Sequence, residues 1–402
     1  MRRGKITSAM VFAVLLVVSS LSLTNWTAAQ IKTQIVHTFD PQATGFPASG
    51  LTPDQHGNLY GVTGGSVYQL TPAKGGVWNY HVIKFLPGGR GAFAAGKLAI
   101  DAAGNLYGAT WQDGTYSCGY VYEVSPPSSG YLWNLSILHE FDCTDGAGAS
   151  YGLTFDAAGN LYGGTHNGGS FSEGVAYELS PSASGWTYTI LHEFSNAEGN
   201  GPQTAMVFDK NGNLFGGNET SIYELSPNGD GTWTFSTAFA FTDATGFNPL
   251  GDPFFDAAGN LYDTNQAAGL YHSGAAFMLT NTSGVWNATV LHSFNSQNTN
   301  DGYYPEGALA MDTSGNLYGT TQSGGGKNNS GIVFELSPTS SGEWTETVLH
   351  RFGAFGSSGG TSPGNALYLD PAGNIYGTAA AGGDTACLPS TGGCGVIYKL
   401  LR

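Results

Sequence analysis

The sequence predicts an all-β protein, a seven-bladed β-propeller of four-stranded blades in which the N-terminal strand closes the last blade. Three observations support this fold. The motif D-x-x-G-N-[LI]-[YF] occurs seven times, each copy lies among four strand-like runs, and the two chain ends supply complementary parts of one unit. Tandem units of roughly 50 residues with four strands each are typical of propeller blades.

Each of the seven units contains the same four runs, which we call strands a to d. In the sixth unit they are "ALAMD" (Ala308–Asp312), "NLYG" (Asn316–Gly319), "GIVFELSP" (Gly331–Pro338) and "EWTETVLHRF" (Glu343–Phe352). β-Branched and aromatic residues dominate the runs, and Gly, Pro, Ser and Asn separate them. The motif copies begin at Asp54, Asp101, Asp156, Asp209, Asp256, Asp312 and Asp370.

The chain ends predict how the ring closes. The last unit stops after strand c, at "GVIYKLLR" (Gly395–Arg402), and has no strand d of its own. The segment "IKTQIVHTFD" (Ile31–Asp40) matches strand d of the other units. We therefore expect Ile31–Asp40 to pair beside Gly395–Arg402, which leaves no unpaired blade edge at that point.

Composition and the N-terminus bear on location and partners. The formal charge of −16 makes nucleic acid an unfavourable partner, because an acidic surface repels phosphate. Arg2, Arg3 and Lys5 precede the apolar run "AMVFAVLLVV" (Ala9–Val18), and the small residues "TAA" (Thr27–Ala29) follow it. This pattern predicts a signal peptide over 1–29 and a single propeller domain over 30–402. We expect a secreted, periplasmic or cell-surface monomer without a membrane span after cleavage; the alternative is an uncleaved anchor.

The repeated motif is interpreted as scaffolding. The Asp can accept hydrogen bonds from backbone N–H groups two or three residues on, and the Gly suits a positive φ. One carboxylate per turn is too few for calcium, which takes six to eight oxygens. His37, His139, His192, His292 and His350 share one position of strand d and are expected to pack or to form hydrogen bonds. Neither "LHEF" copy continues to H-E-x-x-H, so we predict no catalytic residue, metal or cofactor.

The candidate binding surface is the face that carries the b–c and d–a loops. The a–b turns are nearly identical, whereas these loops vary, and function usually resides in variable loops on a rigid scaffold. Trp111 is the one Trp of the predicted mature chain outside a repeated position, and Asp263 replaces the Gly that ends the other six motif copies. The candidate binding residues are Trp111, Asp113, Tyr116, His166, Glu173, Asp263, Tyr271, His272, Asp301, Tyr303 and Tyr304.

The four cysteines suit an exported protein. Cys118 precedes strand c and Cys143 follows strand d of the second unit, so an antiparallel c–d pair brings them together. Cys387 and Cys394 flank a loop of the last unit. We predict Cys118–Cys143 and Cys387–Cys394 disulfides. Four cysteines allow three pairings, and zinc is the competing interpretation, although the spacings are not those of a zinc ribbon.

At "GNLYGTTQSGGG", "GIVFELSP" and "WTETVLHRF" the chain resembles the GloVer-type tandem-repeat family of bacterial secreted and cell-surface proteins. The resemblance covers nearly all of the predicted mature chain. It implies export and a propeller-like body, and it implies no activity, so no catalytic residues are carried over. The motif is also similar to that of lactonase-type propellers, whose enzymes use acidic and amide residues around the central channel.

Three functional hypotheses follow. The first is a non-enzymatic binding module for a glycan or a cell-surface protein, which acts through the b–c/d–a face. The second is a lactonase-type hydrolase or lyase with a metal site at the channel mouth. The third is a purely structural surface protein.

Overall fold

The computed structural model describes residues 31–40, 45–128, 133–149, 151–242, 247–267, 269–354, 356–384 and 392–402. Ile31–Arg402 forms one compact unit. The predicted signal peptide, 1–29, lies outside the described residues. None of the described helices has the length and apolar character needed to cross a bilayer.

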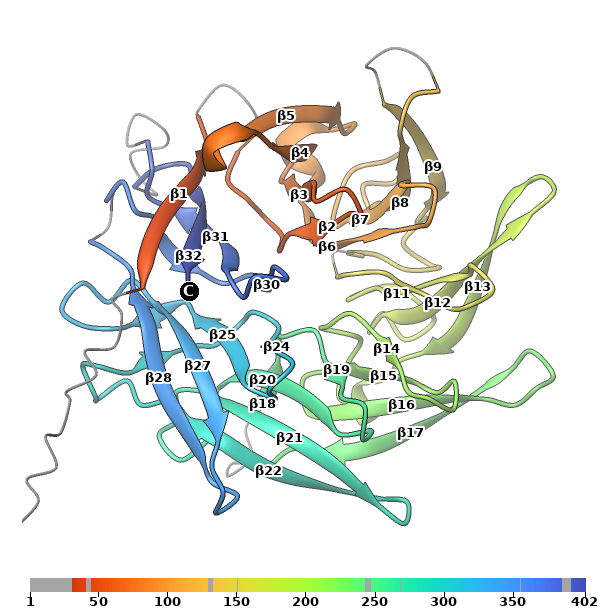
Figure 1. Ribbon diagram of the computed structural model, residues 1–402. Helices are drawn as coiled ribbons and strands as arrows, with labels where there is room; N and C mark the ends of the chain where they lie inside the picture. The colour runs from red at the N-terminus through yellow and green to blue at the C-terminus, as the bar shows by residue number, and fades with distance from the viewer. Residues whose placement is uncertain are drawn as a thin grey trace, which may run out of the picture. The chain divides into compact units, whose positions relative to one another are not determined.

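Seven antiparallel sheets are arranged in a ring, so the all-β, seven-bladed propeller predicted from the sequence is confirmed (Figure 1). Blades are numbered by their motif copies. Blade 1 contains β2 (Thr52–Pro53), β3 (Leu59–Thr63), β4 (Ser66–Pro72) and β5 (Trp78–Phe85), and blade 2 contains β6 (Ala94–Ile100), β7 (Leu106–Thr110), β8 (Tyr120–Ser125) and β9 (Asn134–Glu140). Blade 3 contains β10 (Thr154–Phe155), β11 (Leu161–Gly164), β12 (Val175–Ser182) and β13 (Gly185–Glu193). Blade 4 contains β14 (Val207–Phe208), β15 (Leu214–Gly217), β16 (Ser221–Pro227) and β17 (Trp233–Ala240).

In blades 5 and 7 the innermost strand is split into two short pieces. Blade 5 contains β18 (Phe247–Pro249), β19 (Phe254–Phe255), β20 (Leu261–Ala267), β21 (Ala275–Thr282) and β22 (Val285–Ser293). Blade 6 contains β24 (Ala310–Met311), β25 (Leu317–Thr321), β27 (Ile332–Pro338) and β28 (Trp344–Arg351). Blade 7 contains β29 (Thr361–Pro363), β30 (Tyr368–Leu369), β31 (Ile375–Ala381), β32 (Val396–Leu401) and β1 (Lys32–Thr38). A small ladder pairs β23 (Gly302–Tyr303) with β26 (Ser323–Gly324), and three 3₁₀ turns are η1 (Lys74–Gly76), η2 (Gly89–Ala92) and η3 (Asn196–Glu198).

The ring closes as the chain ends predict. β1 pairs antiparallel with β32, from Lys32 opposite Leu401 to Thr38 opposite Val396, and becomes the outer strand of blade 7. Figure 1 shows the red N-terminal strand beside the blue C-terminal one. Phe39 follows β1 and is 1% exposed, in one apolar cluster with Tyr68 of blade 1 and Ile397 of blade 7. The closing strand therefore joins the last blade to the first.

The a–b turns are built around the repeated Asp. In blade 1, Asp54 Oδ1 accepts the backbone N–H groups of His56 (2.8 Å) and Asn58 (2.9 Å). Its Oδ2 accepts the Asn58 amide (2.7 Å) and the Tyr60 hydroxyl (3.1 Å). The second backbone donor lies four residues on, rather than two or three, because Gly57 at φ 84° turns the chain back towards the carboxylate. Burial alone would raise the pKa of Asp54, but these hydrogen bonds outweigh it and hold the pKa below its ordinary value.

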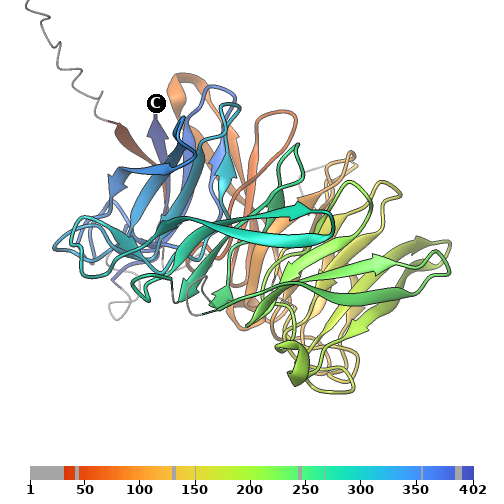
Figure 2. The same cartoon turned by 90° about the horizontal axis from the view of Figure 1, so that it is seen from below.

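The blades present two different sets of connections, which Figure 2 shows at the opposite ends of their strands. The a–b turns and the short c–d hairpins form one face. The b–c and d–a loops form the other, which we call the loop face; they are longer except for the b–c connections of blades 1 and 4, residues 64–65 and 218–220. Residues at or just before strand a of six blades line a common cavity at the centre of the ring, which we call the channel.

Candidate functional site

A disulfide ties two loops of the loop face together in blade 2. Cys118, just before β8, is bonded to Cys143, just after β9, with the two Cα atoms 5.4 Å apart. The predicted Cys118–Cys143 bridge is therefore confirmed, and it suits an oxidising compartment. Cys387 lies outside the described residues, so the Cys387–Cys394 bridge stays a prediction.

Exposed aromatic side chains gather on the loop face. Every exposed Phe or Tyr among the residues whose side chains the structure describes lies in a b–c or d–a loop or at the strand end that leads into one; these residues are Phe46, Phe85, Phe93, Tyr116, Phe171, Tyr271 and Tyr304. On the described parts of the c–d hairpins, which exclude residues 129–132 of blade 2, the exposed large apolar side chains are Val77 and Val285. The two faces therefore differ in chemistry as well as in loop length.

Five of the residues predicted for binding lie on blades 2 and 3. The indole of Trp111 packs against the His166 ring, with centroids 5.4 Å apart, and Gly148 approaches the same indole. Tyr116 is exposed, whereas Asp113 and Glu173 are half-buried. Trp111 therefore supports the loops of this region and is itself only partly available to a ligand.

The predicted residues of blades 5 and 6 form a second group. Tyr271 and His272 are exposed in the b–c loop of blade 5, and Tyr304 is exposed in the next d–a loop. The Tyr304 N–H donates to the Ser273 carbonyl (3.0 Å), which holds the two loops side by side. Tyr303 packs edge-on against Tyr304, with centroids 4.9 Å apart. Asp301 is only 5% exposed, so it does not present its carboxylate on the face.

Asp263 lies elsewhere than the sequence suggested. It is a fully buried residue of β20, paired across the sheet with Phe277. In the other blades a Gly at this position faces the ring of a Tyr or Phe on strand c; in blade 3 a Cβ on Gly163 would stand 2.4 Å from the Tyr177 hydroxyl oxygen. Phe277 has no hydroxyl group, and the Asp263 carboxylate turns towards Thr264, whose N–H it accepts at 2.6 Å.

The channel holds charged residues that the sequence analysis missed. A cavity of about 250 Å³ at its loop-face side is lined by strand-a segments of six blades, and it includes Lys97, Tyr151, Asp252, Glu306 and Asn365. Two further cavities, of 380 and 540 Å³, share Lys97 and Asp252 and continue towards the a–b turns. A recess of 460 Å³ on the opposite face is lined by repeated turn residues of blades 4 and 5, and blades 1 and 2 form a smaller equivalent.

A signal for two of the missed residues was present in the chain. Lys97 and Asp252 each lie four residues before a motif Asp, where the other five units have Gly or Ala. They are the charged exceptions at a position that borders the channel in every blade.

Enclosure by the ring shifts the pKa values of these channel groups. Lys97 reaches the water of the lumen, yet protein surrounds it, so desolvation lowers the pKa of its ammonium while Asp252 partly offsets that effect. Desolvation likewise raises the pKa of the Asp252 carboxyl, although the hydrogen bond that it accepts from the Ala205 N–H (2.9 Å) lowers the pKa in part. Burial and Asp252 together raise the pKa of Tyr151 to about 12. Such groups suit the recognition of polar ligands or proton transfer.

We expect the substitution Asp263→Asn to stabilise the protein at neutral pH. Burial, and secondarily the charge of Asp252, raise the pKa of Asp263 well above its ordinary value of 3.8. Because the folded-state pKa is the higher one, this carboxyl increasingly disfavours folding as the pH rises above about 3.8 towards the folded-state value. Asn keeps a side-chain oxygen that can accept the Thr264 N–H, and it carries no ionisable group. A gain of roughly 1–3 kcal/mol at pH 7 that shrinks towards pH 4 is expected in chemical denaturation; an equal effect at both pH values would contradict it.

Comparisons with known proteins agree with this architecture. The model of the Gloeobacter/Verrucomicrobia repeat family matches residues 63–221 and 217–401. No curated protein matches the chain. Among solved structures, the chain is similar to a streptogramin B lyase, at 11% identity and a TM-score of 0.56, over 92% of this chain and 97% of that one.

A second similar structure is the virginiamycin B lyase of Staphylococcus aureus, at 14% identity and a TM-score of 0.57, over 92% of this chain and 99% of that one. Identities this low establish a shared fold alone. The family matches cover most of the chain, the repeats coincide with the blades, and the resemblance found in the sequence is thereby confirmed. The protein belongs to the Gloeobacter/Verrucomicrobia repeat family and is a seven-bladed β-propeller.

Proposed function

We propose that this protein is an exported, non-enzymatic glycan-binding propeller whose ligand lies on the loop face over the mouth of the channel. The observation that carries this proposal is the gathering of all the described exposed Phe and Tyr side chains on that one face. Exposed aromatic side chains that gather on one surface mark interaction sites more often than scattered ones do.

At two of these aromatic residues the backbone adopts an uncommon conformation. Tyr304 has a φ of 59° and Phe93 a φ of 48°, a left-handed conformation that bulky side chains rarely adopt. The Gln322 N–H donates to the Tyr304 carbonyl (2.9 Å), so both peptide groups of Tyr304 are engaged. Strained residues that are held by their surroundings concentrate at ligand-binding sites. A backbone held this way loses little entropy when a sugar stacks on the ring that it carries.

Polar groups at the channel mouth complement the aromatic rings. Glu306 accepts the side-chain amides of Gln266 (2.5 Å) and Gln322 (3.1 Å), which fixes its carboxylate. Carboxylate and amide groups of this kind bind sugar hydroxyls. The net charge of −16 favours neutral glycans over uronic-acid polymers. Export is supported by the N-terminal pattern and by the Cys118–Cys143 disulfide.

We expect Tyr271→Ala combined with Tyr304→Ala to weaken binding of a neutral oligosaccharide at least about tenfold, which corresponds to about 1.4 kcal/mol. The measurement is calorimetry with the strongest hit of a glycan array. Val285→Ala, on the opposite face, is the matched control and should leave affinity unchanged. Unaltered affinity in the double variant, or array binding by no glycan, would refute the proposal; capture of a protein ligand by the same face would assign it to protein recognition instead.

The second candidate is a hydrolase or lyase of the lactonase type. The shifted pKa values of Lys97 and Asp252 favour it, because catalytic acids and bases are tuned in the same way. The binding experiment separates the two functions. Consumption of the bound compound by the wild-type protein, lost in Asp252→Asn, would identify an enzyme, whereas stable binding without turnover supports the binding module.

A further inference from the structure

Neighbouring blades are joined by a repeated contact between their outer strands. In several blades strand d carries a histidine six residues after the Trp with which it begins. This histidine contacts strand d of the next blade, at the residue two positions after the Trp of that strand. His139 stacks on Tyr188 with centroids 3.9 Å apart and planes 2° apart, and His37 stacks on Tyr80 at 3.8 Å and 8°. The contact between blades 3 and 4, His192 on Phe235, is also stacked. A flat ring therefore occupies the partner position in three of the five contacts that involve a histidine; in a fourth, between blades 6 and 7, the Thr33 hydroxyl lies 2.9 Å from His350 Nδ1.

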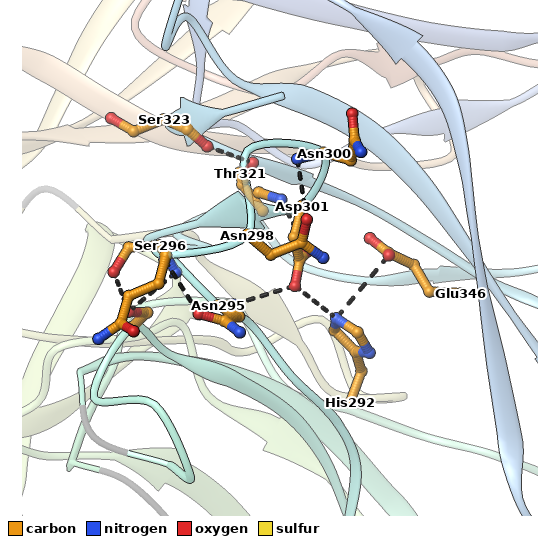
Figure 3. A network of polar contacts seen from close by, with 12 residues as sticks. His292, Asn295, Ser296, Asn298, Asn300, Asp301, Thr321, Ser323 and Glu346 are labelled. Atoms are coloured by element: carbon orange, nitrogen blue, oxygen red, sulfur yellow. Dashed lines mark hydrogen bonds and ion pairs between the residues drawn. The ribbon is translucent and has the colours of Figure 1, made fainter. Parts of the chain in front are cut away.

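The contact between blades 5 and 6 departs from this pattern. Glu346 occupies the partner position, so His292 of β22 faces a carboxylate of β28 in place of a ring. His292 Nε2 lies 3.9 Å from Glu346 Oε2 and 3.5 Å from Asp301 Oδ2. Figure 3 shows the three side chains converging from two outer strands and a d–a loop. One donor atom from each lies within 4.8 Å of the others.

The loop that carries Asp301 is fixed in place. Its Oδ2 accepts the Asn295 N–H (3.0 Å) and its Oδ1 the Gly302 N–H (2.7 Å), as Figure 3 shows in part. Its backbone carbonyl accepts the Gly325 N–H (2.8 Å). With a side chain only 5% exposed, Asp301 is held towards His292 before any ligand binds. Such support of a ligating carboxylate is characteristic of metal sites.

Two side-chain atoms of the cluster are available to bind a metal ion. Glu346 Oε1 is a buried polar atom without a hydrogen-bond partner in the described structure, and His292 Nε2 has no hydrogen bond beyond its ion-pair contacts with the two carboxylates. Buried polar atoms are ordinarily paired, and unpaired ones suggest a missing ion or solvent. A divalent cation would satisfy both atoms and compensate the two carboxylates.

We propose that His292, Asp301 and Glu346 bind a divalent transition-metal ion of the Zn²⁺ class, which joins blade 5 to blade 6. Donor atoms about 2.0–2.1 Å from zinc lie roughly 3.3 Å apart in a tetrahedron. The 3.5 Å between His292 Nε2 and Asp301 Oδ2 is close to this separation, whereas Glu346, at 3.9 Å from the imidazole, would have to move towards the ion. One imidazole and two carboxylates suit zinc or manganese, whereas calcium favours six to eight oxygens and magnesium retains its water. The three side chains leave one tetrahedral position for water. The competing arrangement is a protonated His292 that holds both carboxylates without a metal.

The test is isothermal titration of Zn²⁺ into the chelator-treated protein, together with thermal unfolding. We expect one Zn²⁺ per chain, a rise in Tm of a few degrees, and no response to Ca²⁺ or Mg²⁺. Glu346→Gln should reduce the affinity at least about tenfold, as loss of a charged ligand does. Glu346→Tyr restores the ring found opposite His139 and should abolish the metal response while the metal-free protein stays folded. Anomalous scattering at the zinc edge would locate the ion.

A matched control distinguishes this site from ordinary histidine binding. His139 also lies beside a carboxylate, 2.8 Å from Asp145 Oδ2, but its third neighbour is Tyr188. His139→Ala should lower the Tm without metal and retain the zinc-dependent rise. Absence of a zinc response in the wild type, or a response unchanged in both Glu346 variants, would overturn the proposal and leave the protonated ion-pair cluster as the explanation.

Discussion

Removal of residues 31–40 is expected to abolish cooperative folding of the ring. The deletion removes the whole β1 ladder with β32 and the stacking of His37 on Tyr80. It also removes Phe39, which is buried against Tyr68, and loss of a buried Phe alone costs about 3–5 kcal/mol. Because total stabilities are typically about 5–15 kcal/mol, the combined loss reaches the stability of the entire fold. Thermal unfolding and size-exclusion chromatography would show a missing transition and association through the exposed edge of β32.

The same experiment has a direct rescue. A synthetic peptide of residues 31–40 added to the truncated protein should restore a monomeric species with a cooperative transition, because the strand is contributed from outside blade 7. Lys32→Ala, at an exposed position of β1, is the control and should change stability by no more than about 0.5 kcal/mol. A truncated protein that stays monomeric with an unchanged Tm would contradict the closure argument.

Gly163→Ala is expected to destabilise the protein by roughly 3 kcal/mol, at the upper end of overpacking effects. The added Cβ would stand 2.4 Å from the Tyr177 hydroxyl oxygen and 2.7 Å from Leu153 Cδ2, inside a closed part of blade 3. Neither neighbour can move far, because Tyr177 is fully buried between strands. Chemical denaturation would measure the loss as a lower midpoint with an unchanged slope.

Two variants test the cause of that loss. Adding Tyr177→Phe to Gly163→Ala removes the hydroxyl and should recover part of the stability, but not all of it, since the ring carbon Cζ of Tyr177 is also close, at 2.6 Å. Gly359→Ala places a Cβ where no atom lies within 4 Å and should be neutral within about 0.5 kcal/mol. Equal effects at positions 163 and 359 would show that the contact with Tyr177 is not what makes Gly necessary.

Much of the fold could be derived from local patterns. The seven Asp turns form within a few residues, so their hydrogen bonds and positive-φ Gly follow from the motif itself. Ring closure could also be predicted, because Ile31–Asp40 matches the sequence of strand d and the last unit has no strand d of its own. The Cys118–Cys143 bridge followed once strands c and d were taken as an antiparallel pair.

The candidate site could be derived only in part. Tyr271 and Tyr304 were chosen because they lie in variable loops, and the structure places both of them exposed on the loop face. Asp263 also departs from the repeat, but it lies within β20 at a position whose side chain points into the blade. There it is paired across the sheet with Phe277 and is buried. Lys97 and Asp252 were missed, although the Gly or Ala of the other units marked their position, since nothing local shows that this position borders the axis.

By itself the sequence determined the unit, the number of units and the way the two ends join, because these depend on short-range turns and on a periodicity that repeats along the chain. The tertiary structure alone decided which side chains meet at the axis and between outer strands. Lys97 and Asp252 are brought to one channel from blades 2 and 5, and Glu346 is brought to His292 across a blade boundary. Such meetings depend on the curvature and tilt of whole sheets, which no local pattern of residues records.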